Sequence, residues 1–322
     1  MFLLFATATG IPASTHEPVE VVASFDASLG ELPEGVALDK KGNIYVSLGP
    51  PFFVGGGYGE VRQISPDGTE TTLVQYPSGP APAGLAVDAR GNVYFTVPDL
   101  TQAAVGVYRI TDDGAERLPG TESMLIPNGL AIDKRGNVFA SDSATGAIWR
   151  YPRGGTTPAQ MWFAHELLAG CEVGDVGANG IAFWKGDLYV ANTGRGALVH
   201  IPVSNRGVPG TPTIIAGDQD CDPTDELWSM DGIAFDVHGD VYALLVLQDK
   251  LVRIDPGEGT TTLLMDRDDG LWNPASLAFG TGGGDRQSLF IANYAVLPPE
   301  PTNSPGPAVL KVDVHVPGLP LP

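Results

Sequence analysis

The sequence has few cysteines, few basic residues and no long apolar run. Its 322 residues include 18 Lys or Arg against 38 Asp or Glu, which gives a net charge of −20 and a pI near 4.4. The negative electrostatic field of such a protein repels phosphate backbones and anionic bilayers, so neither nucleic acid nor a membrane is an expected partner. No stretch approaches the roughly 20 continuous apolar residues that a spanning helix needs.

The two cysteines and the first 18 residues bear on the cellular location of the protein. Cys171 and Cys221 could pair between neighbouring loops or remain free thiols, and both alternatives stay open. Residues 1–18 open with a short apolar run that has no basic region before it, as in a leader or partial signal segment. Location is uncertain, and these features favour secretion or periplasmic export slightly over the cytoplasm.

Several catalytic motifs are also missing. No G-x-S-x-G elbow occurs, and the glycine run GGGYG from Gly55 lacks the Lys-Ser/Thr of a phosphate-binding loop. The five histidines show no metal-binding spacing, and only His165 lies in a loop that could approach a site. Nucleophilic serine chemistry and nucleotide binding are therefore disfavoured.

One heptapeptide pattern occurs six times, at spacings of 44 to 52 residues. The copies are PEGVALD from Pro33, PAGLAVD from Pro82, PNGLAID from Pro127, ANGIAFW from Ala178, MDGIAFD from Met230 and PASLAFG from Pro274. In most copies an Asp-x-x-Gly-Asn/Asp turn and a second strand-like run follow, then a third and usually a fourth. Six copies of four short strands predict an all-β, six-bladed β-propeller.

The sixth repeat ends after its third strand. The segment VEVVASF, which precedes the first repeat, can supply the missing fourth strand and remove two open sheet edges. Residues 19–316 would then form one propeller, followed by a C-terminal tail over residues 317–322. The only candidate helix is a short one near Trp162 to Leu168.

The first strand of each blade lines the channel of a propeller, so one position of the repeat forms a ring. The residue before the pattern glycine is Glu34, Ala83, Asn128, Asn179, Asp231 and Ala275 in turn. Two close carboxylates in a confined site require a cation or a proton. Oxygen ligands predict a hard divalent cation, for which we expect Ca²⁺, with Zn²⁺, Mn²⁺ and Mg²⁺ as alternatives.

Asp142, Asn192 and Asn293 end second strands and point toward the same region, although they could equally be strand-end turn residues. Taken singly, the ring residues could also be turn residues; the metal interpretation rests on their common phase.

The repeats and the ring resemble the senescence marker protein (regucalcin) and gluconolactonase family of six-bladed propellers, over about Pro33 to Val314. The resemblance implies that Glu34, Asn179 and Asp231 hold the cation and that Asn128 faces the substrate. It implies a metal-dependent lactonase, with Asp231 and Asn128 as catalytic residues and a small lactone as the substrate. No counterpart of the family's arginine near Asn128 is apparent, which puts a sugar-acid lactone in doubt.

The repeats also resemble the NHL type, in which many propellers only bind. The alternative function is therefore a non-catalytic binding propeller with a structural ion. Nothing in the sequence requires an oligomer, so a monomer is expected.

Overall fold

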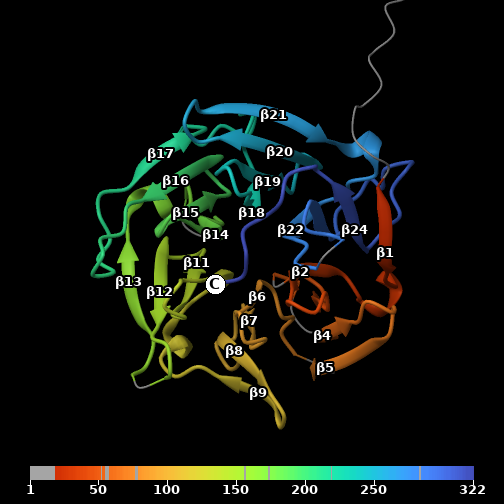
Figure 1. Ribbon diagram of the computed structural model, residues 1–322, viewed down its shortest axis with the longest axis horizontal. Coiled ribbons are helices and arrows are strands. Elements are labelled where there is room, and N and C mark those ends of the chain that lie inside the picture. The colour runs from red at the N-terminus through yellow and green to blue at the C-terminus, as the bar shows by residue number, and fades with distance from the viewer. Residues whose placement is uncertain are drawn as a thin grey trace, which may run out of the picture.

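The computed structural model describes residues 19–322 apart from residues 52, 55–57, 77–78, 156, 173–174, 219 and 283. Six four-stranded antiparallel sheets surround a central channel, as Figure 1 shows. The fold prediction is thus confirmed. The expected leader, residues 1–18, and the first glycines of the GGGYG run lie outside the described residues.

Each blade runs from an inner strand at the channel to an outer strand at the rim. The first three blades comprise β2 (Pro33–Leu38), β3 (Ile44–Leu48), β4 (Gly59–Ile64) and β5 (Glu70–Tyr76); β6 (Leu85–Val87), β7 (Val93–Val97), β8 (Gly106–Thr111) and β9 (Gly114–Arg117); and β10 (Pro127–Ile132), β11 (Val138–Asp142), β12 (Ala147–Tyr151) and β13 (Gln160–Ala164). The last three comprise β14 (Ala178–Trp184), β15 (Asp187–Asn192), β16 (Ala197–Ile201) and β17 (Thr213–Ala216); β18 (Met230–Phe235), β19 (Val241–Leu245), β20 (Lys250–Asp255) and β21 (Thr260–Met265); and β22 (Pro274–Phe279), β23 (Ser288–Asn293), β24 (Ala308–Asp313) and β1 (Glu20–Ser24).

The ring closes by the predicted strand from the other end of the chain. Strand β1 pairs antiparallel with β24, from Glu20 opposite Lys311 to Ser24 opposite Ala308. Figure 1 shows these two strands, red and dark blue, side by side. Closure leaves both ends of the repeat array in one blade and removes two open edges.

The Asp-x-x-Gly turn that follows the inner strand in blades one, two, three and five has a common construction. In blade three, Asp133 accepts hydrogen bonds from the backbone N–H of Arg135 and of Asn137, at 2.8 and 2.9 Å. Gly136 has φ +81°, a conformation that glycine adopts without strain. The aspartate of this motif therefore ties the turn together while its glycine lets the chain reverse.

Short 3₁₀ turns are the only helical elements among the described residues. The helix expected from Trp162 to Leu168 is wrong in extent: Trp162 lies in strand β13, and only Glu166–Leu168 forms a 3₁₀ turn. Trp162 packs edge-on against Phe139 of the same blade, which keeps the segment in the sheet. No helix in the described part of the chain has the length and apolarity to cross a membrane.

The inner strands pack so closely that their glycines are obligatory. A Cβ placed on Gly129 would lie 2.3 Å from the carbonyl oxygen of Asn179, and one on Gly180 would lie 2.3 Å from that of Asp231. Gly35 and Gly84 make the equivalent contacts with the residues Ala83 and Asn128. The residue before the glycine in one blade thus rests on the glycine of the blade before it.

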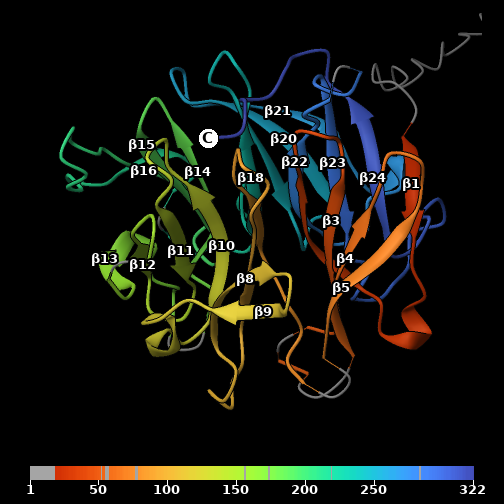
Figure 2. The same ribbon diagram turned by 60° about the horizontal axis from the view of Figure 1, so that its bottom comes forward.

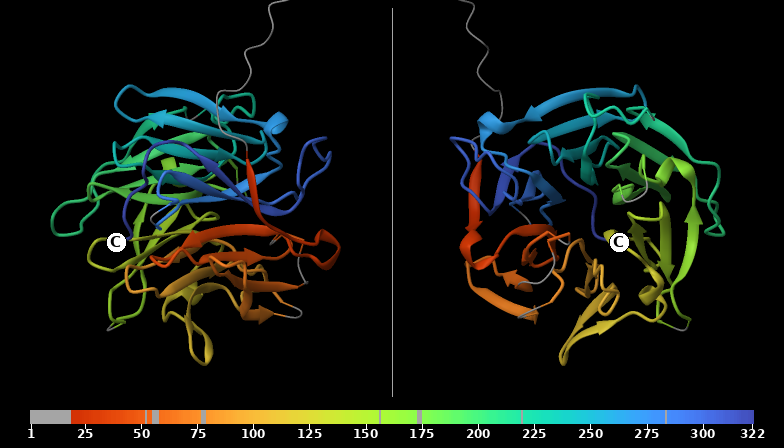
Figure 3. Two further views of the ribbon diagram at one scale, coloured as in Figure 1. Left: turned by 45° about the vertical axis from the view of Figure 1, so that its right-hand side comes forward. Right: turned by 180° about the vertical axis from the view of Figure 1, so that it is seen from behind.

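Residues 314–322 cross the channel end opposite to the start of the inner strands. Val237 and Ala89, in turns of blades five and two, donate backbone N–H bonds of 2.9 Å to the carbonyls of Pro317 and Pro322. Leu319 and Leu321 line a cavity of about 250 Å³ in this half of the channel. Figure 1 and the right-hand view of Figure 3 show the segment, in dark blue, reaching the middle of the ring, and Figure 2 shows its end at the upper face of the propeller.

We predict that Gly180→Ala destabilises the propeller, because the added methyl meets the Asp231 carbonyl and the backbones must move apart. The expected loss is about 1–3 kcal/mol, typical of overpacking a close-packed interior. Urea unfolding measures it. Gly284→Ala, where a Cβ would have no neighbour within 4 Å, is the matched control. Equal stability of the two variants would show that the inner strands can separate freely.

Candidate functional site

The four polar ring residues meet at one end of the channel. Glu34, Asn128, Asn179 and Asp231 all line a pocket of about 220 Å³, together with the two alanines of the ring. A bulge interrupts each of their strands at this point: in blade four, Ala178 pairs with Asn192 and Ile181 with Val190, which leaves one extra residue. The bulge turns the side chain before the glycine into the channel.

The two carboxyl groups of the ring interact electrostatically. Burial raises the pKa of Glu34 to about 8. Burial also raises the pKa of Asp231 well above its ordinary value, the Glu34 charge raises it further, and a hydrogen bond from Asn179 offsets part of this rise. Two such groups cannot both be ionised here without a compensating positive charge.

The amide of Asn179 has an assigned orientation. Its Nδ2 lies 3.1 Å from the Thr193 hydroxyl, and this hydroxyl donates its own proton to the Met230 carbonyl at 2.8 Å. A hydroxyl whose proton is used can only accept, so the amide must present its N–H to it. The amide oxygen of Asn179 is then left to face the channel.

Asn128 repeats this arrangement in blade three. Its Nδ2 donates to the Ser143 hydroxyl at 3.3 Å, and Ser143 donates to the Ala178 carbonyl at 2.7 Å. Both asparagines are buried, with exposed fractions of 9% for Asn128 and 4% for Asn179. Ser143 and Thr193 are therefore positioning residues for the two amide oxygens.

The chemistry of these groups fits a hard cation. The Oε2 atom of Glu34 is buried and has no hydrogen-bond partner among the described residues. Its neighbours are a second carboxylate and an amide oxygen with a fixed orientation, the ligand types that Ca²⁺ and Mg²⁺ prefer. Among the described residues no group of three or more His, Cys, Asp or Glu is arranged to hold a metal ion, so any ion here would depend on the asparagine oxygens.

Tyr294 is a site residue that the sequence reasoning missed. It lines the pocket, and its pKa is raised well above the ordinary value by burial, by Glu34 and by Asp231. Its phenol is therefore a neutral donor. Tyr294, Ser143 and Thr193 share one position, the residue directly after the second strand of a blade. Aligning the repeats at that position would have found all three.

The polar residues that end second strands anchor loops. Asp142 accepts from the N–H groups of Leu125 and Ile126 at 2.9 and 3.0 Å. Asn293 accepts from the Trp272 N–H at 2.7 Å and donates to the Gly306 carbonyl at 2.9 Å. Both are fully buried away from the pocket lining.

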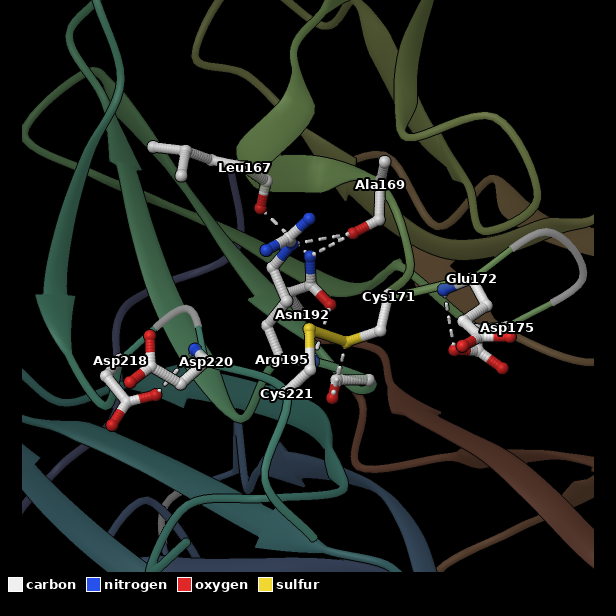
Figure 4. Close-up of a disulfide and its surroundings, with 11 residues drawn as sticks. Leu167, Ala169, Cys171, Glu172, Asp175, Asn192, Arg195, Asp218, Asp220 and Cys221 are labelled. Carbon is white, nitrogen blue, oxygen red and sulfur yellow. Dashed lines mark hydrogen bonds between the residues drawn. A yellow bond between two sulfur atoms is a disulfide. The ribbon is translucent and has the colours of Figure 1, made fainter.

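Asn192 has the same anchoring role beside a disulfide. Cys171 and Cys221 are bonded, which joins the loops that lead into blades four and five (Figure 4). Asn192 donates to the carbonyls of Leu167 and Ala169, each at 2.9 Å, and so holds the first of these loops. That loop carries Val176 to the pocket wall.

His165 does not join the site. Its Nδ1 accepts from the Leu167 N–H at 3.2 Å and so caps the 3₁₀ turn Glu166–Leu168, while its ring stacks on Phe163. It is not among the residues that line the pocket.

Comparison with known proteins identifies the fold. No protein-family model matches the sequence, and no curated protein matches it. A gluconolactonase from Xanthomonas campestris has a similar structure, with a TM-score of 0.62 and 18% identity over 94% of this chain and 96% of its own. A luciferin-regenerating enzyme is similar at a TM-score of 0.64 and 13% identity, over 94% and 98%.

A chain of a nidogen/laminin complex is also similar, at a TM-score of 0.59 and 16% identity, over 77% of this chain and 84% of that one. The chain therefore shares the six-bladed propeller fold of these proteins. Identities this low leave the function to be argued from the site itself.

We predict that the free energy of unfolding of chelator-treated protein falls as the pH rises from about 5 to 9. Above the pKa of 4.5 for a free glutamic acid the unfolded chain releases a proton that folded Glu34 retains up to about pH 8, so rising pH favours unfolding. Glu34→Gln should weaken this dependence and leave the part that the raised pKa of Asp231 contributes, whereas Glu116→Gln at the surface should leave it unchanged. Urea titrations across the range provide the measurement, and parallel profiles for wild type and Glu34→Gln would contradict the assignment.

Proposed function

We propose that this propeller is a metal-dependent hydrolase that opens a lactone or related cyclic ester at the mouth of its channel. The observation that carries the proposal is the convergence of Glu34 and Asp231, with an unpartnered Glu34 oxygen, beside amide oxygens held by Thr193 and Ser143. Glu34, Asn179 and Asp231 would hold the cation, for which Ca²⁺ is the first candidate.

The cation supplies Lewis acidity toward the ester carbonyl and lowers the pKa of water. Asp231 accepts a proton from the attacking water while the oxygen of that water bonds to the carbonyl carbon. When the ring C–O bond breaks, this proton returns to the departing alkoxide, so that lactone and water yield one hydroxy acid. Asp231 thus has two roles, ligand and base.

Two neutral donors complete the site. Asn128 is in the pocket lining and its Nδ2 donates one N–H to Ser143, so the second N–H of this amide can orient the substrate or stabilise the negative charge that develops on the carbonyl oxygen. Tyr294 retains its proton because its pKa is raised, and it faces the same two carboxyls. It would donate a hydrogen bond to the substrate.

A non-catalytic binding propeller with a structural ion is the alternative. The similarity to a chain of the nidogen/laminin complex favours it, because that chain belongs to an assembly of proteins. An ion without turnover would be the result that distinguishes it.

We predict that Ca²⁺ stabilises the wild-type protein and fails to stabilise Glu34→Gln or Asp231→Ala. An ion that binds only the folded state adds about 2.7 kcal/mol when its concentration is 100 times Kd. Thermal unfolding with and without Ca²⁺ measures this, with Mg²⁺, Mn²⁺ and Zn²⁺ as comparisons. Asp112→Asn, an exposed acid, is the control and should respond as wild type. Equal stabilisation of all variants would place the ion elsewhere.

We predict metal-dependent proton release from γ-, δ- and aryl lactones at constant pH. Asp231→Ala should abolish it, since a general base typically contributes about 10²–10⁴ in rate. Asn128→Ala should lower kcat by roughly 10²–10³ while Ca²⁺ still stabilises the variant, because an oxyanion donor acts only in the reaction. Ion binding without turnover in the wild type would favour the binding propeller, and loss of the ion in Asn128→Ala would make Asn128 a ligand.

A further inference from the structure

The walls of the pocket differ in chemistry from its floor. Above the ring residues the lining comes from apolar side chains on the loops, including Pro50, Pro98, Val176, Val246, Val296 and Leu297. Proline has no backbone N–H to donate, so Pro50 and Pro98 offer a ligand no backbone donor. No lysine, arginine, histidine or glutamine is among the described residues of the lining.

The side chains of Asn273 and Thr193, the other polar residues of the wall, are already hydrogen-bonded within the protein. Asn273 donates to the Val246 carbonyl at 3.0 Å and accepts from the Leu297 N–H at 2.8 Å, so it joins two wall segments. Thr193 is committed to Asn179 and Met230. Tyr294 alone remains as a donor above the ring, and it faces the carboxyls.

Apolar character continues outward from the pocket. Phe53, Leu247 and Leu297 line the pocket and are still 62%, 45% and 40% exposed, on three loops at this end of the propeller. These three side chains extend the apolar lining to the rim of the pocket on a protein whose net charge is −20.

We infer that the substrate is a hydrophobic lactone, with an alkyl or aryl substituent on its ring, and that polyhydroxylated sugar lactones are rejected. The inference rests on the proposed function and names its substrate class. The ester group reaches the polar floor while the substituent lies along the proline, valine and leucine walls. Sugar hydroxyls would lose their water against these walls and find no side-chain hydrogen-bond partner there beyond Tyr294.

The first test compares kcat/KM for δ-decalactone, δ-valerolactone and glucono-δ-lactone, which share one ring size. Each buried methylene favours binding by roughly fourfold, so the pentyl group of δ-decalactone should raise kcat/KM over δ-valerolactone by at least about tenfold. Glucono-δ-lactone should fall at least roughly tenfold below δ-valerolactone. A preference for the sugar lactone would overturn the inference.

A binding test separates this inference from the reaction itself. The lactams that correspond to δ-decalactone and to gluconolactone are not hydrolysed, and isothermal calorimetry gives their affinities. Tighter binding of the pentyl lactam supports the substrate class even if no lactone turns over, in which case only the proposed hydrolysis fails. Tighter binding of the sugar lactam, or no binding of either, overturns the inference.

Wall variants locate the preference. Val246→Thr and Val296→Thr keep the side-chain shape but replace one methyl by a hydroxyl. Each should reduce the ratio of kcat/KM for δ-decalactone to that for δ-valerolactone by several-fold without removing Ca²⁺ stabilisation. Val208→Thr, exposed in a loop of blade four that does not line the pocket, is the matched control. An unchanged ratio in both wall variants would show that the substituent lies elsewhere.

Discussion

The contact between each inner-strand glycine and the carbonyl of the next blade is the constraint on which the site depends. It leaves no room for a side chain at the glycine and so sets the distance between neighbouring inner strands. Hydroxyls of the second strands reinforce it: Thr96 donates to the Asn128 carbonyl and Ser141 to that of Asn179, at 2.8 and 2.7 Å. The backbone of the ring is therefore fixed by neighbours that take no part in chemistry, which leaves its side chains free for function.

The closing joint between blades six and one departs from this rule. Ser276 stands where the other repeats have glycine, and its hydroxyl lies 3.4 Å from the Val36 N–H as an acceptor. The sixth blade also carries no polar ring residue, since Ala275 precedes Ser276. Instead it contributes Tyr294 from the end of its second strand. Every blade except blade two thus contributes a polar side chain to the site. Four blades do so from the first strand, and blade six does so from the residue after its second strand.

How far the sequence could predict this structure depended on whether a residue lies inside the repeat. The ring on the first strands was predictable because residues at the same position of each repeat lie at the same level of the channel once the propeller closes. Glu34 and Asp231 are examples. Ser143 and Thr193 were just as regular in position, but they were missed because their function appears only through the asparagines they orient. Asp142 has the same regularity and serves a loop, so phase alone cannot separate a site residue from an anchor.

Segments outside the repeat were not predictable in this way. The loops that build the pocket walls have no partner copy, and the path of residues 314–322 across the channel depends on contacts with turns of distant blades. The pairing of Cys171 with Cys221, left open by the sequence, follows from two loops that the blade order brings side by side.

The difference between residues inside the repeat and loops outside it has a consequence for function. The two carboxyls and two oriented amides of the pocket floor are set by the repeat, and they would suit the proposed activation of water and a carbonyl by a hard cation. The walls are set by loops that the repeat does not constrain, so they can change without disturbing the floor. Similar folds with identities of 13–18% can therefore differ in substrate while the blades remain superimposable. In this chain the wall segments are rich in proline, valine and leucine. Asn273 uses both its amide N–H and its amide oxygen to join the segments of Val246 and Leu297. A polar side chain that holds apolar walls together, and offers nothing to the ligand, is the arrangement expected where the substrate itself is apolar.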